Sequence, residues 1–193
     1  MRLSVSLYIV WDGNMTKDTL SKIEVACRQL DTAIKLWFQE ENPVSIHTLV
    51  CSAHQIISDV IHHQNRNDPL FDNIYIKNGF KKIAKTHFHK YYNFFKHANN
   101  DPETSIKFNP SANEYFIVCS IFGLEQLNIK HNLLHRTFMT YFAIHHPRLL
   151  TDECLNLFFH SIPPEHFAKI RRWTRQEFFD EFSETFPYLA RWI

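Results

Sequence analysis

Glycine is scarce in this sequence, and long apolar runs are missing. Only three of the 193 residues are glycine, namely Gly13, Gly79 and Gly123. This is too few for a turn-rich β-sandwich or for glycine loops around phosphate. The GxxxxGK[ST], GxGxxG, GxSxG, CxxC and HExxH patterns are all absent, which excludes most of the enzyme classes that such motifs mark. No apolar run reaches about 18 residues, so we expect no membrane span.

Charge and cysteine content are both unremarkable for a protein of the cell interior. Lysine and arginine number 21 against 20 acidic residues, a net charge of +1, so any electropositive feature has to be local. The four cysteines are scattered without a close pair, which favours reduced core thiols over a disulfide framework. The first residues are too short and too interrupted by serine for a signal peptide. We expect a cytoplasmic protein, and nothing in the sequence indicates a cofactor.

Apolar residues recur at three- and four-residue steps along most of the chain, which predicts an all-α fold. Four such segments suggest an up-and-down four-helix bundle within residues 15–128. We predict its helices at residues 16–41, 43–62, 80–98 and 111–128. Asn42 and Pro43 fit the cap and first residue of the second helix.

Both ends of the chain differ from this central part. Residues 1–14 alternate apolar and polar side chains like a lone strand. We expect a poorly packed arm, and the alternative is an upstream extension of a protein that starts at Met15. Residues 129–193 read as a helical extension packed on one side of the bundle. Prolines, among them Pro147 and Pro187, are expected to separate its helices, which we predict at residues 131–145, 151–160, 164–173 and 175–186.

The stretch from Asn73 to Asn100 holds six lysines and three histidines without one acid. On the predicted third helix these cations form a stripe roughly 25–30 Å long at about 1.5 Å per residue. Such a stripe suits an anionic partner, with a tyrosine ring available for stacking. The alternative is a solvated face, or one paired with acids of the C-terminal segment such as Glu177, Asp180, Glu181 and Glu184. The predicted anion-binding residues are Lys81, Lys82, Lys85, His89 and Tyr92.

The same helix offers a candidate for acid–base chemistry on a phosphodiester. Asn93 and His97 are one turn apart, and an imidazole beside a cation and an amide is the minimum for such chemistry. In this hypothesis His97 is the general acid–base, Lys90 and Lys96 stabilise the phosphorane, and Asn93 positions the substrate. The alternative is structural, because cations and His97 at a helix C-terminus interact favourably with the helix dipole.

A second polar stripe lies on the second predicted helix. His47, Cys51, His54, Ser58 and His62 follow one another at steps of three or four residues, which places them on one flank of the apolar face. Two imidazoles and a thiol could ligate zinc. No carboxylate joins them, so we interpret the stripe as boundary-layer packing and predict no metal.

Two segments resemble known proteins. The run CRQLDTAIKLWFQEENPVSIHTLVCSAHQIISD (27–59) and the run NFFKHANNDPE (93–103) resemble an uncharacterised bacterial all-helical family with an NFFKHAxxDP motif, which implies no activity. More distantly, the long helices look like the HEPN group, many of whose members are ribonuclease toxins or antiviral effectors. Those enzymes bear an arginine, then four to six intervening residues, then a histidine. Here Lys90 precedes His97 at that spacing instead, and lysine lacks the bidentate fork of arginine.

These observations lead to three functional hypotheses. The first is a HEPN-like protein whose Lys/His-rich helix binds an anionic partner, either RNA or an acidic protein. The second is a metal-independent ribonuclease of toxin or antiviral type. The third is a structural module that forms a homodimer through its aromatic C-terminal face.

Overall fold

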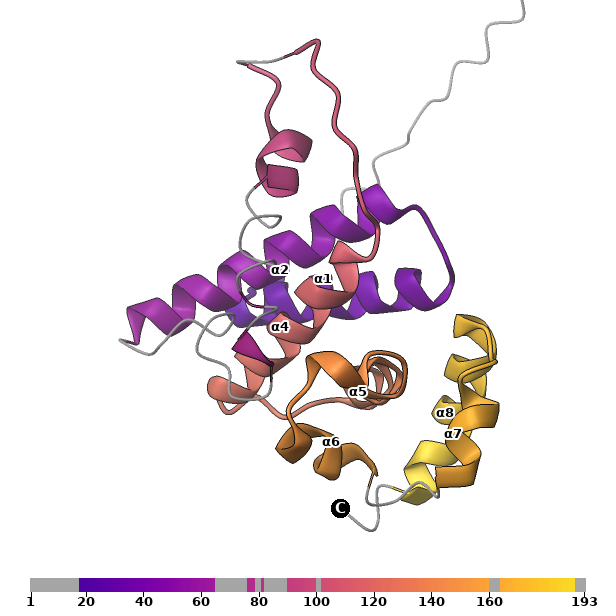
Figure 1. Ribbon diagram of the computed structural model, residues 1–193. Helices are drawn as coiled ribbons and strands as arrows, with labels where there is room; N and C mark the ends of the chain where they lie inside the picture. Colours follow the sequence, from indigo (N-terminus) through magenta and orange to yellow (C-terminus); the bar gives the residue numbers. More distant parts are fainter. Residues whose placement is uncertain are drawn as a thin grey trace, which may run out of the picture.

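The computed structural model describes residues 18–64, 76–78, 81, 90–99, 102–159 and 164–189. Within these residues the chain is helical, with one isolated antiparallel bridge between Ile76 and Leu150, so the prediction of an all-α fold is confirmed (Figure 1). Its elements are α1 (Lys22–Phe38), α2 (Pro43–His63), α4 (Ala112–Gln126), α5 (Leu133–His145), the short 3₁₀ helix η1 (Pro147–Leu149), α6 (Asp152–Phe159), α7 (Pro164–Ile170) and α8 (Arg175–Leu189).

Helix α1 is shorter than its apolar pattern predicts. The expected start near Thr16 was wrong, because Ser21 caps the helix: its hydroxyl accepts from the Glu24 backbone while the Glu24 carboxylate accepts from the Ser21 backbone. This reciprocal capping box satisfies two backbone donors that the first turn leaves unpaired. The expected end near Glu41 was also too late. Glu40 has a φ of 55°, a left-handed conformation that ends a helix and turns the chain toward α2.

Helix α2 begins as predicted. The Asn42 side chain accepts from the backbone of Val44 and Ser45, and Pro43 is the first helical residue. By length and composition α2 would be able to cross a membrane, with a mean hydropathy of 1.2 over its most apolar 18 residues. A core helix of a soluble protein passes the same test, and the absence of a membrane span stays a prediction.

Helix α4 lies at the centre of the core. Its residues from Asn113 to Leu124 are all buried except half-buried Tyr115. It packs against α2, which in turn packs along α1 (Figure 1). A helix that is apolar on every side has to be covered on every side. The four cysteines are free thiols, and three of them are buried, in agreement with the expected core thiols.

The C-terminal helices are joined to α1 by aromatic side chains. The Trp37 ring meets Phe138 and Tyr141 of α5 edge-on, each with centroids 4.9 Å apart, and Phe38 stacks on Phe178 of α8 at 6.4 Å. Edge-to-face and stacked pairs add specific geometry to the burial of large apolar area. Helix α5 is seen almost end-on in Figure 1, so it crosses α1 and α2 instead of running along them.

The predicted end of the last helix, at the residue before Pro187, was wrong. Pro187 does not end the last helix, because α8 continues to Leu189. A proline within the last turn removes one backbone donor, and the turn before it still closes.

The arm at residues 1–14 lies outside the described residues. Of the predicted third helix only residues 90–96 are described as continuous helix, so the up-and-down four-helix bundle stays a prediction.

Candidate functional site

A basic groove lies between the helical turn at residues 90–96 and the extended segment at residues 104–107. Its volume is about 990 Å³. The described residues that line it are Lys90, Asn93, Phe94, His97, Asn99, Thr104, Ser105, Ile106 and Lys107. Seven of them are exposed, while Phe94 and Ile106 are half-buried. The groove is therefore open to solvent, with two apolar side chains among polar ones.

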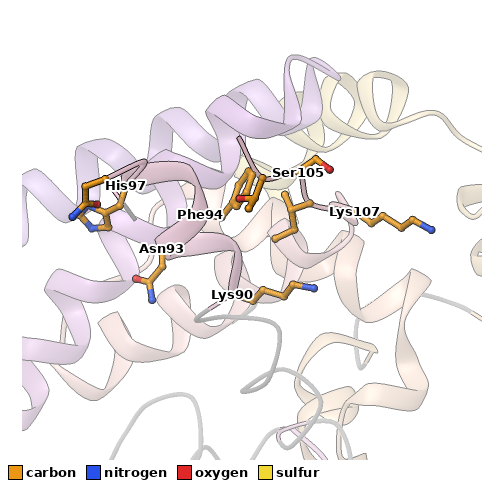
Figure 2. A pocket seen from close by; sticks show the side chains of 9 residues that line it. Lys90, Asn93, Phe94, His97, Ser105 and Lys107 are labelled. Carbon is orange, nitrogen blue, oxygen red and sulfur yellow. The ribbon is translucent and has the colours of Figure 1, made fainter. Parts of the chain in front are cut away.

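The arrangement of side chains gives the groove two unlike ends. Lys90 and Lys107 extend toward one end, and His97 lies at the other, with Asn93 and Phe94 between them (Figure 2). Lys90, Asn93 and His97 follow one another at steps of three and four residues, so a single helix face presents all three. Lys107 and Ser105 come from the opposite wall.

Hydrogen bonding and aromatic packing hold the two walls together. The Tyr91 hydroxyl donates to the backbone carbonyl of Lys107 over 3.2 Å. The rings of Tyr91 and Phe108 meet edge-on at 5.0 Å, and those of Phe95 and Phe108 at 5.1 Å. Adjacent residues of the helical turn thus have separate roles. Lys90 and Phe94 face the groove, while Tyr91 and Phe95 anchor the turn.

Below these anchoring rings lies a buried polar network in the core. His47 is fully buried, and its Nδ1 lies 2.7 Å from Asn113 Oδ1. Asn113 Nδ2 donates to the carbonyl of Pro43, so its Oδ1 is the acceptor for the imidazole N–H. His47 Nε2 is then left to accept from the Cys51 thiol at 3.3 Å. The side chains of His47, Asn113 and Cys51 thus satisfy one another inside the core, as buried polar groups require.

Cys51, His47 and Asn113 follow one another in the order of a nucleophile, a base and an orienting amide. The Cys51 thiol, however, is not activated. Burial lowers the pKa of His47, and the hydrogen bond to Asn113 offsets part of that shift. Burial likewise raises the pKa of the Cys51 thiol, against a smaller opposite effect of the Lys96 charge. A thiol needs a lowered pKa to act as a nucleophile. We therefore assign the network a structural role.

The cations of the groove have no acidic partner among the described residues. Lys90, Lys107 and His97 take part in none of the described ion pairs, and none of the described lining residues is acidic. Two of the C-terminal acids that could have matched them have hydrogen-bond partners of their own: Glu177 caps α8 through Thr174, and Asp180 accepts from Gln176. A positively charged, solvent-facing groove attracts anions.

Of the four predicted catalytic residues, the structure brings three into the groove. Lys90, Asn93 and His97 line it. Lys96 is not among the described lining residues. Its ammonium lies 3.8 Å from the centre of the Tyr92 ring, a cation–π contact on another side of the turn.

The predicted anion-binding stripe is described only in part. Tyr92 is half-buried beside Lys96, and Lys81 is half-buried. Neither is among the described lining residues of the groove. The remaining predicted residues, Lys82, Lys85 and His89, lie outside the described residues.

Sequence reasoning missed one whole wall of the groove. Thr104, Ser105, Ile106 and Lys107 belong to the connection between the helices predicted at residues 80–98 and 111–128, for which we predicted no role. The one signal for it was Lys107, a cation between two proline-containing turns. Which helix face that cation meets depends on tertiary packing, which no local pattern encodes.

The second polar stripe was also placed too near the surface. His47, Cys51 and His54 are buried instead of forming a boundary layer, because α4 covers this flank of α2. His62 is exposed. Among the residues that the structure describes, no group of three or more His, Cys, Asp or Glu side chains is placed to hold a metal ion.

Comparison of the chain with protein-family models, with curated proteins and with solved structures finds no match. The functional argument therefore depends on the groove itself.

Proposed function

We propose that this protein binds single-stranded RNA in the basic groove. The observation that carries the proposal is the composition of the groove: two lysines, a histidine, two amides, two hydroxyls, a phenylalanine and an isoleucine, with no acid among the described lining residues. Lysine ammonium groups neutralise phosphates, and an aromatic face accepts an unpaired base. The resemblance to the HEPN group supports the same proposal, because many of its members are ribonucleases.

A single strand fits the groove better than a duplex does. Phe94 is half-buried and lines the groove together with Asn93 and the two hydroxyl side chains of the opposite wall, so its ring suits an unpaired base that enters the groove and not a base stacked inside a helix. Asn93 and Asn99 supply donors and acceptors for the edge of such a base. Sequence-tolerant binding through stacking and phosphate contacts is typical of single-strand binders.

The experiment is fluorescence anisotropy of a labelled twelve-nucleotide RNA at several salt concentrations. The test variant is Lys90→Gln with Lys107→Gln, and the matched control is Lys22→Gln with Lys130→Gln, two exposed lysines outside the groove. Each lost phosphate contact should reduce the slope of log affinity against log salt by about 0.7. We therefore expect a slope smaller by about 1.4 in the test variant and no change in the control.

Two results would overturn the proposal. One is an RNA affinity that does not depend on salt. The other is an equal reduction of the salt slope in the test and control variants. A polyglutamate competitor decides between partners. If polyglutamate displaces the RNA at equal charge concentration and binds as tightly on its own, the groove recognises acidic proteins instead.

A second candidate function is cleavage of the bound RNA without a metal. It is favoured by one observation, that His97 is exposed and shares the groove with Asn93. The imidazole would take the proton of the ribose 2′-hydroxyl as that oxygen attacks the adjacent phosphorus, and the departing 5′-oxygen would be protonated in return. Lys90 would stabilise the developing charge from farther along the groove.

Cleavage comes second because the cations and the imidazole lie at opposite ends of the groove (Figure 2). Labelled RNA incubated with protein and excess chelator tests it. We expect cleavage by the wild type that is lost in His97→Ala and retained in His63→Ala, an exposed histidine at the end of α2. A wild type that leaves the RNA intact removes this candidate and leaves the binding proposal standing.

A further inference from the structure

A second charged cluster lies where α4, α5 and α8 meet. Its centre is Glu114, whose side chain is only 9% exposed. One carboxylate oxygen lies 2.7 Å from Nε2 of His146, and the other lies 3.5 Å from the Arg175 guanidinium. A buried carboxylate requires such partners. His146 and Arg175 are themselves about one-third exposed, at 36% and 33%, so the cluster opens to solvent on their side.

A further arginine is fixed beside these groups. Arg171, in the turn between α7 and α8, donates from Nε to the carbonyl of Ile144 over 3.1 Å. This bond orients the guanidinium at the end of α5, where His146 lies. The two terminal nitrogens of Arg171 have no hydrogen-bond partner among the described residues, and the side chain is exposed.

His145 is next to His146 in sequence and is affected by the same charges. Burial lowers its pKa first, and the positive charges of His146, Arg171 and Arg175 lower it further, while Glu114 acts in the opposite direction. Its Nε2 atom is buried and has no hydrogen-bond partner in the described part of the chain. The ring stacks on Tyr141 at 4.0 Å, so it cannot turn away without losing that contact.

Charge is unbalanced in this cluster. Glu114 is the one carboxylate in ion-pair contact with these cations among the described residues, where it meets His146 and Arg175, while Arg171 is held nearby at the carbonyl of Ile144. Glu177, the nearest acid along the chain, is bonded to the backbone of Thr174. Cations that are held together without enough anions repel one another. An anion bound between them would relieve that repulsion.

We infer that His146, Arg171 and Arg175 form a binding site for a phosphate group. Arginine matches phosphate through paired, charge-assisted hydrogen bonds, and an imidazole adds a third donor when its free nitrogen carries a proton. Two of the three donors are already oriented, Arg175 by Glu114 and by the Trp37 ring 4.1 Å away, and Arg171 by Ile144. Pre-oriented donors lose little freedom on binding.

This site is independent of the basic groove and of its proposed RNA. None of its residues is among the described lining residues of the groove. If these side chains only held α8 against the core, the contacts of Glu114 with Arg175 and His146 would be sufficient. Such a role would not need an exposed Arg171 whose two terminal nitrogens have no hydrogen-bond partner in the described part of the chain.

The test follows the His146 ring protons by NMR while inorganic phosphate is added to the full chain. Sodium acetate at matched ionic strength serves as the control anion. We expect a saturable shift with phosphate, with an affinity reduced about tenfold in Arg171→Gln, the loss of one charge-assisted contact. Arg171→Lys keeps the charge but lacks the bidentate guanidinium, so its phosphate affinity should lie between those of the wild type and Arg171→Gln. Arg136→Gln, an exposed arginine near the other end of α5, is the matched control.

Each possible outcome decides the matter. Equal shifts with acetate and phosphate, or an undiminished phosphate shift in Arg171→Gln with its melting curve intact, would overturn the site. If the twelve-nucleotide RNA produces the same His146 shift as inorganic phosphate, the phosphate belongs to a nucleic acid. If only inorganic phosphate does so, the source is a small phosphorylated molecule. The groove variant Lys90→Gln with Lys107→Gln should keep the phosphate shift, so failure of the groove proposal is distinguishable from failure of this one.

Discussion

His47 of α2 and Asn113 of α4 are 66 positions apart in sequence, and their side chains are joined by a 2.7 Å hydrogen bond inside the core. Asn113 also donates to the carbonyl of Pro43 at the start of α2. One amide therefore ties the first turn of α4 to two successive turns of α2. The same imidazole is surrounded by the rings of Phe95, Phe108 and Phe116, each about 5 Å away. The network thus supports the walls of the basic groove from below.

Replacing Asn113 by alanine should destabilise the protein by about 2 kcal/mol, because the buried imidazole N–H and the Pro43 carbonyl both lose a partner. Urea denaturation followed by circular dichroism measures the change. Asn156→Ala, an exposed position on α6, should change the free energy of unfolding by less than about 0.5 kcal/mol. An equal effect of the two substitutions would show that the Asn113 network contributes nothing beyond helix propensity.

The buried thiols should resist alkylation in the folded protein. Burial raises the pKa of Cys51 and raises that of Cys154 to about 12, and the reactive species is the thiolate. Half-buried Cys27, although its pKa is also raised, should react first with iodoacetamide at pH 8. Peptide mass spectrometry assigns the sites. Labelling of Cys51 as fast as that of Cys27 would show that the aromatic layer above it does not exclude the reagent, whereas labelling only in urea fits the structure.

Stability should decrease as the pH falls below 6.5. His47, His131 and His145 all have pKa values below 6.5, chiefly because burial disfavours the charged ring. Between these lowered values and 6.5 the unfolded chain binds more protons than the folded one, so the stabilisation is complete above 6.5 and is lost on acidification. Each histidine contributes up to about 1.4 kcal/mol per pH unit. Urea titrations from pH 7.5 to 5 measure the slope, and His47→Gln should reduce it. An unchanged slope in that variant would assign the effect to other groups.

Part of this fold follows directly from local sequence. Asn42 and Pro43 predict the start of α2 correctly, because a cap and a proline act within one turn. Ser21 and Glu24 carry an equally local signal for the start of α1. We predicted the start too early because we followed the apolar pattern of the residues before Ser21. The left-handed Glu40 has no such signal, since glycine or asparagine is the usual residue there.

The candidate site was predictable only along one helix. Lys90, Asn93 and His97 share a face at helical spacing, and the structure brings all three into the groove. Lys96 is one residue from His97, yet it turns toward Tyr92, because neighbouring residues on a helix point in different directions. Lys107 and the bond between His47 and Asn113 depend on which segments meet in three dimensions. A single sequence does not contain that information in any local pattern.

Tyr91 offers a test of whether the groove needs its two walls held together. Tyr91→Phe removes the hydroxyl that donates to the Lys107 carbonyl and leaves every charge in place. RNA affinity should therefore fall by up to about tenfold, the worth of one hydrogen bond, while the salt slope stays the same. Lys90→Gln should instead reduce that slope by about 0.7. Tyr115→Phe, a half-buried tyrosine on α4, is the matched control and should bind like the wild type. If Tyr91→Phe binds RNA as tightly as Tyr115→Phe does, the wall at residues 104–107 takes no part in recognition, and the binding surface reduces to the exposed face of the helical turn.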